Sequence, residues 1–326
     1  MSKLVTVYGG SGFVGRYITR RLAQNGWRVR VAVRRPNEAM HVKPYGVVGQ
    51  VEPVFCNIRD DASVRAVMQG ADAVVNCVGI LAETGKNKFD SVQHEGAERI
   101  ARIAAAEGID RMVQISAIGA DTGSESAYSR TKALGEEGVL QHMPGAVILR
   151  PSIVFGPEDE FFNRFAGMAQ LGPILPVVGA ETKFQPVYVD DVARAAVMGV
   201  EGDAAPGIYE LGGPDVDTFR ELMVQMLQII RRRRLVVNIP FWIARIMGGT
   251  FGVLNRISFG LIPAPVTLDQ VRNLAVDNVV SDKARGFADL GITPTSLEAV
   301  LPDYLWRFRP GGQYAEIQES ARDLRD

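Results

Sequence analysis

The sequence predicts an α/β protein in which helices cover both faces of a parallel sheet, joined to a smaller, discontinuous C-terminal lobe. Three observations predict it. A glycine-rich turn joins the first strand to the first helix, strands and helices alternate through the first half, and Pro and Gly clusters interrupt the alternation after Pro151. With 326 residues, the chain suits one domain with a lobe or two small domains.

The first strand is short and apolar, and it runs directly into the glycine-rich turn. Gly9, Gly12 and Gly15 have the spacing of a dinucleotide-binding turn. Gly9 permits a tight turn, Gly12 lets the backbone approach phosphates, and Gly15 lets helix and strand pack closely. The next helix starts at Phe13 and Val14, so its first amide groups point at the anion. We expect all five residues to bind the pyrophosphate of a cofactor.

The remaining strands of the first half are also apolar, and two of them are unbroken runs. Residues 73–75 and 147–149 contain only Ala, Val, Ile and Leu, as expected of strands buried on both faces. We expect strands at 3–8, 28–33, 51–55, 72–77, 111–116 and 146–150, and helices at 13–25, 61–69, 88–107 and 126–142. In a parallel sheet of this kind, ligands bind beyond the carboxyl ends of the strands.

The second half supplies one more βα unit, at 184–200, and then the lobe. A helix follows whose apolar side chains recur at helical spacing and are expected in the lobe core: Phe219, Leu222, Met223, Met226, Leu227 and Ile230. We assign residues 1–155 and the unit at 184–200 to the nucleotide-binding domain. Residues 156–183 and 201–326 form the expected lobe.

Composition narrows the function classes. A formal net charge of -1 argues against nucleic acid as a partner. Cys56 and Cys77 have no CxxC spacing and are expected to be reduced core residues, and the three His lack metal-ligand spacing. The first strand starts at Lys3, so we expect no signal or transit peptide and a cytosolic, bacterial chain.

The end of the second strand indicates which nucleotide binds. Arg34 and Arg35 stand where an acidic residue would bind the ribose of NAD, and guanidinium groups pair with a 2′-phosphate instead. This favours NADP(H), although a solvated loop is the alternative. Further positions after strands are expected beside the cofactor: Asn57 and Ile58 at the adenine, and Cys77, Val78 and Gly79 along the backbone.

Tyr128 and Lys132 lie four residues apart, so they share one face of the expected helix. A neighbouring ammonium lowers the pKa of a phenol, which is about 10 in isolation. The pair is therefore a candidate acid/base for hydride chemistry at a carbonyl.

Together these features resemble the extended, atypical branch of the short-chain dehydrogenase/reductase superfamily, which has a Rossmann-type fold. Residues 149–157 and 188–193 also look like that branch. The resemblance implies that Lys132 binds the nicotinamide ribose and that Pro151 and Ile153 line the nicotinamide pocket. Active relatives place a hydroxyl one or two residues beyond Ser116, where this chain has Ala117 and Ile118. The Ser116 hydroxyl either reaches the substrate carbonyl itself or, as a strand-end residue, bonds the backbone.

Residues 126–136, 155–166 and 183–189 resemble one family more closely, the nucleotide-binding accessory subunit of respiratory complex I (alpha-subcomplex subunit nine). The resemblance implies tightly held, structural NADPH, and other complex I subunits as partners near the quinone-reaction region. It also implies a peripheral location on the cytoplasmic side of the bacterial inner membrane, or on the matrix side in a mitochondrion. The missing hydroxyl fits a protein that kept the cofactor and lost the reaction.

The lobe combines cations with apolar residues. Four arginines, Arg231 to Arg234, are followed by Phe241, Trp242, Ile243 and Arg245, and later by Phe259 to Ile262. This mixture suits contact with phospholipid headgroups or with a groove on a partner protein. In the alternative, the arginines compensate the charge at a helix end and the apolar residues form a buried lobe core.

Two other functions remain open. The chain could be an NADP-dependent reductase or epimerase acting on a small or nucleotide-linked substrate, with Tyr128 as acid/base and Lys132 as its cationic neighbour. It could also be a soluble redox-sensing regulator that binds NADP(H) and a transcriptional partner.

Overall fold

A computed structural model describes residues 3–257 and 267–312, with residues 251–257 described as helix without their side chains. Phe259 to Ile262, expected in the lobe, lie outside the described residues. The chain divides into two compact units: residues 1–152, 189–212 and 280–293 form the first, and 153–188, 213–279 and 294–326 the second.

The first unit contains a seven-stranded parallel sheet in the order β11-β6-β5-β4-β1-β2-β3, which confirms the predicted fold class. Its strands are β1 (Leu4–Tyr8), β2 (Arg28–Val33), β3 (Val51–Phe55), β4 (Ala73–Asn76), β5 (Arg111–Ile115), β6 (Val147–Pro151) and β11 (Gly207–Leu211). The strand order reverses between β1 and β4, where such sheets bind ligands.

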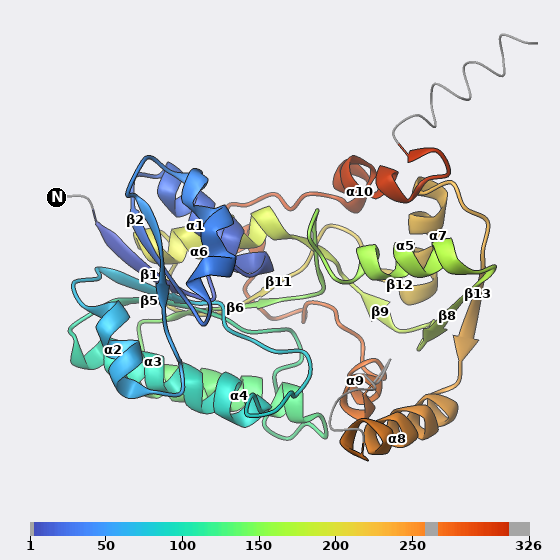
Figure 1. Cartoon of the computed structure of the whole chain (residues 1–326), viewed down its shortest axis with the longest axis horizontal. Coiled ribbons are helices and arrows are strands. Elements are labelled where there is room, and N and C mark those ends of the chain that lie inside the picture. The colour runs from blue at the N-terminus through green and yellow to red at the C-terminus, as the bar shows by residue number, and fades with distance from the viewer. Residues whose placement is uncertain (1–2, 258–266, 313–326) are drawn as a thin grey trace, which may run out of the picture. The chain divides into compact units, whose positions relative to one another are not determined.

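Helices cover both faces of this sheet. Figure 1 shows α1 and α6 on one face and α2, α3 and α4 on the other. The helices are α1 (Phe13–Gln24), α2 (Asp61–Met68), α3 (Glu95–Ala106), α4 (Ala127–His142) and α6 (Val189–Glu201), with short helices η1 (Pro36–Tyr45), η2 (Asp90–His94) and η3 (Phe287–Leu290). The helix expected at 88–107 is thus divided, because η2 is a π-helical turn that precedes α3.

β11 was not predicted, and it places residues 201–212 in the first unit instead of the lobe. It pairs in parallel with β6 along its whole length. Residues 280–293 join the same unit because the Ser281 amide donates to the Glu210 carboxylate at 2.8 Å and the Arg285 guanidinium lies 4.5 Å from the Tyr209 ring centre. Proline and glycine around the strand hid it from the sequence pattern.

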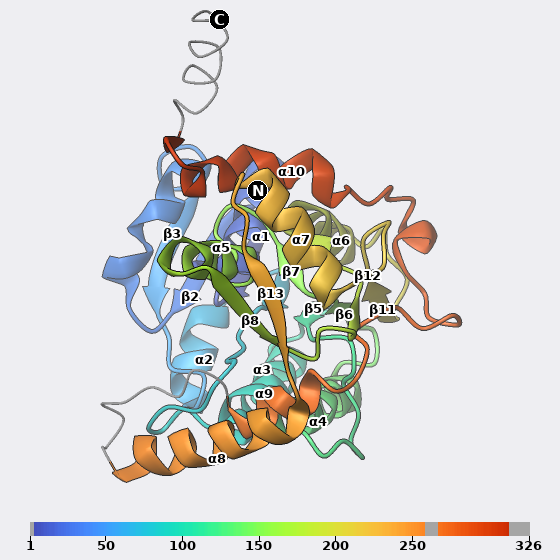
Figure 2. The same ribbon diagram turned by 90° about the vertical axis from the view of Figure 1, so that its right-hand side faces the viewer.

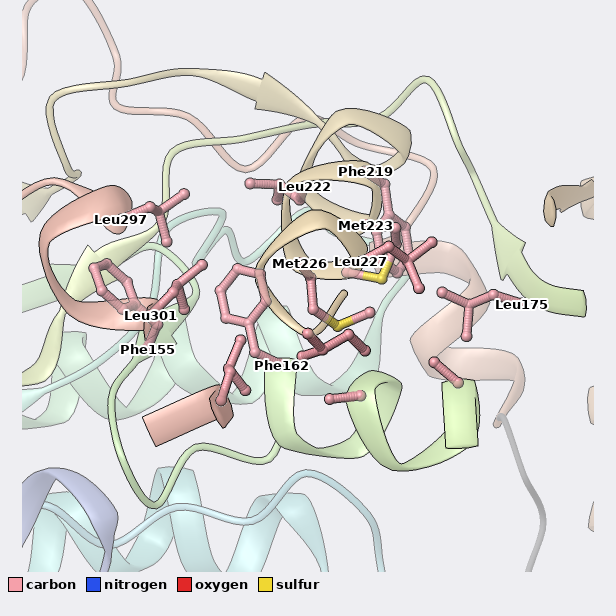
Figure 3. Close-up of a cluster of buried hydrophobic side chains, with 14 of the residues drawn as sticks. Phe155, Phe162, Leu175, Phe219, Leu222, Met223, Met226, Leu227, Leu297 and Leu301 are labelled. Atoms are coloured by element: carbon pink, nitrogen blue, oxygen red, sulfur yellow. The ribbon is translucent and has the colours of Figure 1, made fainter. Parts of the chain in front are cut away.

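The second unit has its own apolar core, shown in Figure 3. All six side chains expected in the lobe core are buried in it. Helices α5 (Phe162–Leu171), α7 (Phe219–Ile229) and α10 (Leu297–Leu305) surround it, followed by η4 (Trp306–Phe308). The buried Asp159 carboxylate accepts from the Tyr304 hydroxyl, which joins two distant parts of the chain. Burial raises the pKa of that carboxyl above its ordinary range.

Short strands complete the second unit. β8 (Ile174–Val178) pairs in parallel with β13 (Leu235–Ile239), and the two lie side by side in Figure 2. The other strands are β7 (Val154–Phe155) with β10 (Val187–Tyr188), and β9 (Lys183–Phe184) with β12 (Asp217–Thr218). The single strand expected from residue 184 is therefore two short ones. Helices α8 (Phe241–Ile257) and α9 (Leu268–Asn273) follow β13.

The arginine run has two different environments. Arg232 donates to the Phe308 carbonyl at 2.9 Å and Arg234 to the Ala169 carbonyl at 2.8 Å, so both hold backbone within the lobe. Arg231 and Arg233 are exposed, as is Trp242 on α8. Among the described residues, no helix combines the length and the apolar character that crossing a bilayer requires.

Candidate functional site: a nucleotide pocket at the glycine-rich turn

The glycine-rich turn has the geometry that its spacing predicted. Gly9 has a φ of +74°, which favours glycine, and its amide donates to the Ala32 carbonyl at 2.9 Å. A β-carbon at Gly15 would lie 2.3 Å from the Gly9 carbonyl oxygen. Since that oxygen belongs to the backbone, glycine at position 15 is what allows α1 to begin against the turn.

The first turn of α1 is suited to an anion. Its N-cap residue is Gly12, and within the described residues no side chain caps this end; the first turn also carries no acidic residue. A β-carbon at Gly12 would come 3.2 Å from the Gly9 carbonyl, so the turn is tight there. Uncapped amides and the positive end of the helix dipole favour a phosphate group. The residues present therefore fit a dinucleotide pyrophosphate.

A cavity of about 280 Å³ lies at this turn, beyond the carboxyl ends of β1 and β4. Gly79 and Tyr128 line it together with the glycine turn, Phe13 and Val14. Cys77, expected beside the cofactor with Val78 and Gly79, also lines it, whereas sequence reasoning missed three other lining residues: Ile80, Leu81 and Ile115. All three lie at or just after the carboxyl end of β4 or β5, which was the signal that could have found them.

The expectation that Cys77 is a core residue is wrong. β4 ends at Asn76, so Cys77 turns toward the cavity and remains only partly buried, whereas Cys56 is fully buried. Both cysteines are free thiols. Burial raises the pKa of the Cys77 thiol to about 12, so the thiol remains protonated at neutral pH. Val78 contacts the turn instead, with its Cγ2 atom 3.3 Å from a β-carbon built on Gly9.

Tyr128 and Lys132 share one face of α4, as predicted. The Lys132 Nζ atom lies 6.0 Å from the Tyr128 ring centre, donates to the Ile115 carbonyl at 3.3 Å and is 3.3 Å from a β-carbon built on Gly79. Burial lowers the pKa of Lys132 to about 8 and raises the pKa of Tyr128 to about 12. The predicted lowering of the tyrosine pKa is therefore wrong for the chain itself, because burial raises it.

The Ser116 hydroxyl is engaged away from Tyr128. It donates to the buried Glu136 carboxylate, whereas the sequence left a substrate carbonyl or the backbone as its partner. Glu136 also receives two guanidinium N–H groups of Arg150, at 2.9 and 2.6 Å, and Arg150 lies 3.5 Å from Glu210. Ser116 thus belongs to an ion network that joins β5, α4, β6 and β11.

The other predicted site residues lie elsewhere in the described chain and do not line the cavity. Arg34 and Arg35 are exposed just after β2, and Arg35 forms an exposed ion pair with Glu38 at 3.0 Å. The other four predicted residues have protein neighbours. Asn57 Oδ1 accepts from the Arg59 amide, and Ile58 packs against Gly96. The Pro151 carbonyl accepts from the Ile118 amide, and Ile153 packs on the core of the second unit.

The residues that the structure describes include no cluster of His, Cys, Asp or Glu able to hold a metal ion.

Known proteins resemble this chain in sequence and in fold. The family model described as NAD dependent epimerase/dehydratase family matches residues 5–212. The mitochondrial NADH dehydrogenase (ubiquinone) 1 alpha subcomplex subunit 9 of Arabidopsis thaliana is 39% identical over 317 residues, covering 95% of this chain and 79% of the relative. The mitochondrial NADH-ubiquinone oxidoreductase 40 kDa subunit of Neurospora crassa is 33% identical over 310 residues, covering 95% and 80%.

Among solved structures, a Thermus thermophilus UDP-glucose 4-epimerase in complex with NAD superposes with a TM-score of 0.69. It covers 94% of this chain and 98% of its own at 19% identity, a level at which the likeness concerns the fold.

Proposed function

Since the chain belongs to the NAD dependent epimerase/dehydratase family and, within it, to the alpha subcomplex subunit 9 family of NADH dehydrogenase, we propose that it is an NADPH-binding, non-catalytic accessory subunit of respiratory complex I. It would dock peripherally beside the membrane arm, with other complex I subunits as its partners. One observation supports the proposal that the subunit is non-catalytic. The nucleotide turn is intact, whereas the candidate hydroxyl directly after β5, on Ser116, donates to Glu136.

The nucleotide is held along the carboxyl edge of the sheet in this proposal. The amides of residues 13–15 bind the pyrophosphate, and Arg34 and Arg35 bind the 2′-phosphate that distinguishes NADPH from NADH. Exposure supports the arginine assignment, because both guanidinium groups are accessible to a ligand. The remaining assignments are Asn57 and Ile58 at the adenine, Val78 and Gly79 along the backbone, Lys132 and Tyr128 at the nicotinamide ribose, and Pro151 and Ile153 at the nicotinamide.

The protein groups needed for hydride chemistry are incomplete in this chain. Bound NADPH supplies a hydride in enzymes, but a reacting carbonyl also needs a hydrogen-bond donor and a proton source. Ala117 and Ile118 carry no hydroxyl, and Ile118 is buried. With its pKa raised to about 12, Tyr128 holds its proton at neutral pH and remains a donor, so the missing group is the second hydroxyl beside it.

The proposal is tested first by the nucleotide that the protein carries. The purified full chain is denatured, and the released nucleotide is identified by its mass. We expect NADPH or NADP⁺ in nearly equimolar amount, because a tightly bound nucleotide stays on the protein during purification. The same tight binding stabilises the fold by mass action. Release of NADH or NAD⁺, or of no nucleotide, would contradict the assignment.

An NADP-dependent reductase or epimerase is the second candidate, favoured by the position of Tyr128 on the cavity wall. The Ala117→Ser and Ile118→Ser variants separate the two functions. If the lost hydroxyl explains the lost chemistry, one of them gains measurable NADPH oxidation with small carbonyl compounds. Activity in the unmodified chain would favour the enzyme.

A further inference from the structure

The segment from Ile80 to Phe89, which we call the strap, forms part of the cavity wall. Ile80 and Leu81 line the cavity together with the glycine turn, and Leu81 is 60% exposed. An exposed leucine at the mouth of a cavity gains contact area when a ligand fills the space below it. The strap is therefore positioned to control entry to the nucleotide site.

The start of the strap is fixed to α4 through Gln93. The buried Gln93 side chain donates to the Ile80 carbonyl at 2.7 Å, and its Oε1 atom lies 3.2 Å from the Thr131 hydroxyl oxygen. α4 approaches this closely because position 135 is glycine: a β-carbon there would lie 2.2 Å from the Gln93 carbonyl oxygen. Gln93 belongs to the π-helical turn η2, a distortion often found at functional sites.

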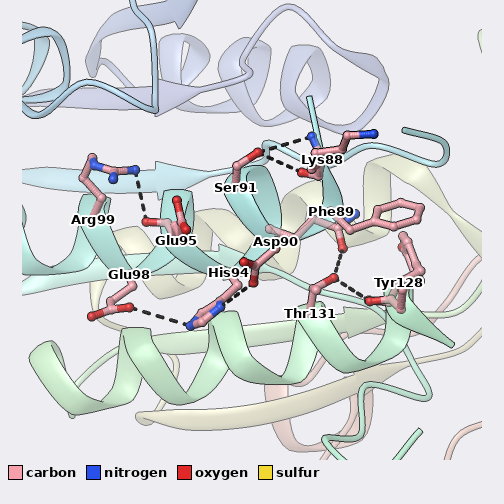
Figure 4. A network of polar contacts seen from close by, with 12 residues as sticks. Lys88, Phe89, Asp90, Ser91, His94, Glu95, Glu98, Arg99, Tyr128 and Thr131 are labelled. Carbon is pink, nitrogen blue, oxygen red and sulfur yellow. Dashed lines mark hydrogen bonds and ion pairs between the residues drawn. The ribbon is translucent and has the colours of Figure 1, made fainter. Parts of the chain in front are cut away.

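The end of the strap is fixed by Phe89. Its side chain is buried, and its ring meets the Tyr128 ring edge-on, with the ring centroids 5.9 Å apart. Figure 4 shows the two rings next to each other. The Phe89 amide also donates to the Glu83 carboxylate at 3.0 Å, and Glu83 pairs with Lys88 at 3.3 Å. Both ends of the strap are thus held on the helix that carries Tyr128 and Lys132.

The tip of the strap is held at the Lys86 carbonyl, which accepts from the Arg59 guanidinium and, at 3.5 Å, from the Ser91 hydroxyl. Thr84 and Asn87 exchange backbone hydrogen bonds at 3.1 and 3.0 Å, which makes a tight turn. The Arg59 guanidinium, from the loop after β3, donates to the Lys86 carbonyl at 3.0 Å near the surface. Breaking the Arg59 bond exposes no apolar core, because residues 82–86 and 88 are already exposed, and it leaves the Lys86 carbonyl only the longer contact with the Ser91 hydroxyl.

We propose that the strap is a gate over the nucleotide site and that Arg59 is its latch, a positioning residue that sets how long the nucleotide stays bound. The inference rests on the proposed function. A gate slows entry and exit alike, because both require it to be open, and it leaves the equilibrium affinity nearly unchanged. A direct contact between Arg59 and the nucleotide would slow release alone.

The two mechanisms are distinguished by measuring both rate constants for NADPH by stopped-flow fluorescence. In Arg59→Ala, we expect the association and dissociation rate constants each to rise about fivefold, the factor that one ordinary hydrogen bond supplies, with Kd within twofold of the unmodified chain. Arg65→Ala is the matched control: it removes an arginine from α2 that pairs with Glu107 at 3.0 Å, and it should leave both rates unchanged.

Limited trypsin digestion provides a readout that does not need the nucleotide. Lys86 and Lys88 lie in the strap, so Arg59→Ala should be cleaved there faster than Arg65→Ala. Unchanged rates, or faster dissociation alone, would overturn the gate. Failure of the unmodified chain to bind NADPH would instead refute the proposed function, and digestion would still test whether Arg59 holds the tip.

Discussion

Replacing Glu136 with glutamine should destabilise the first unit more than any exposed charge change. The Glu136 side chain is 4% exposed and accepts from the Ser116 hydroxyl and twice from Arg150. Glutamine keeps the shape but loses the charge, and it turns one acceptor into an amide donor that faces the guanidinium.

The expected loss of unfolding free energy depends on the partner that Arg150 keeps. Breaking a buried ion pair costs about 3–5 kcal/mol. Arg150 is 19% exposed and keeps Glu210 at 3.5 Å, so we expect the lower end of that range. A loss of about 3 kcal/mol is a large part of the 5–15 kcal/mol that holds a typical domain folded.

Urea unfolding measures this cost as a fall in the midpoint at constant slope. Glu137→Gln is the control, because Glu137 is the exposed neighbour and its loss should change the free energy of unfolding by less than about 0.5 kcal/mol. Adding Arg150→Met to the first variant removes the stranded cation and should recover part of the stability. If Glu136→Gln costs no more than Glu137→Gln, the network does not stabilise the fold and our interpretation of Ser116 is wrong.

Three further predictions concern the nucleotide site. Charge reversal of Arg34 and Arg35 to glutamate should weaken NADPH by about tenfold or more and NADH much less, in a direct binding titration; an equal loss of both would refute the 2′-phosphate assignment. Gly15→Ala places a β-carbon 2.8 Å from the Gly10 Cα atom, so it should lower the free energy of unfolding by about 1–3 kcal/mol and abolish most NADPH binding. Gly145→Ala is the control, because a β-carbon there meets open space and should leave stability unchanged. Equal unfolding midpoints of the two variants would contradict this prediction. Burial lowers the pKa of Lys132 from 10.5 to about 8, so between these pH values the unfolded state holds a proton that the folded state has lost, and stability rises with pH. The free energy of unfolding of the nucleotide-free protein should therefore gain about 2 kcal/mol from pH 8 to pH 10 relative to Lys132→Met. Parallel pH profiles of the two proteins would exclude the shift.

Local sequence patterns predicted the glycine-rich turn and the central strands, whose structure depends on neighbouring residues. The glycine spacing predicted the turn because β-carbons at Gly12 and Gly15 would both meet the Gly9 carbonyl, a few residues away. The unbroken apolar run at 73–75 predicted a central strand because a strand buried on both faces needs apolar side chains throughout. β11 escaped because its five residues stand among Pro and Gly, and its pairing with β6 bridges a long stretch of sequence.

The chemistry of the site depended on tertiary contacts that spacing does not contain. Ser116 and Glu136 are twenty residues apart, and their hydrogen bond is visible only when β5 and α4 pack together. The pKa of Tyr128 depends on how far the fold removes the phenol from water, and burial raises it. No sequence pattern assigned a role to Arg59, and its bond to Lys86 is evident only in the fold.

The most direct test of the account is native electrophoresis of mildly solubilised membranes from the source organism, following the tagged chain. We predict that the chain migrates with NADH dehydrogenase activity in one large complex and that NADPH is recovered from that band. Migration as a free monomer or small oligomer would contradict the subunit assignment and would make the cavity beside Tyr128 a place to search for a substrate.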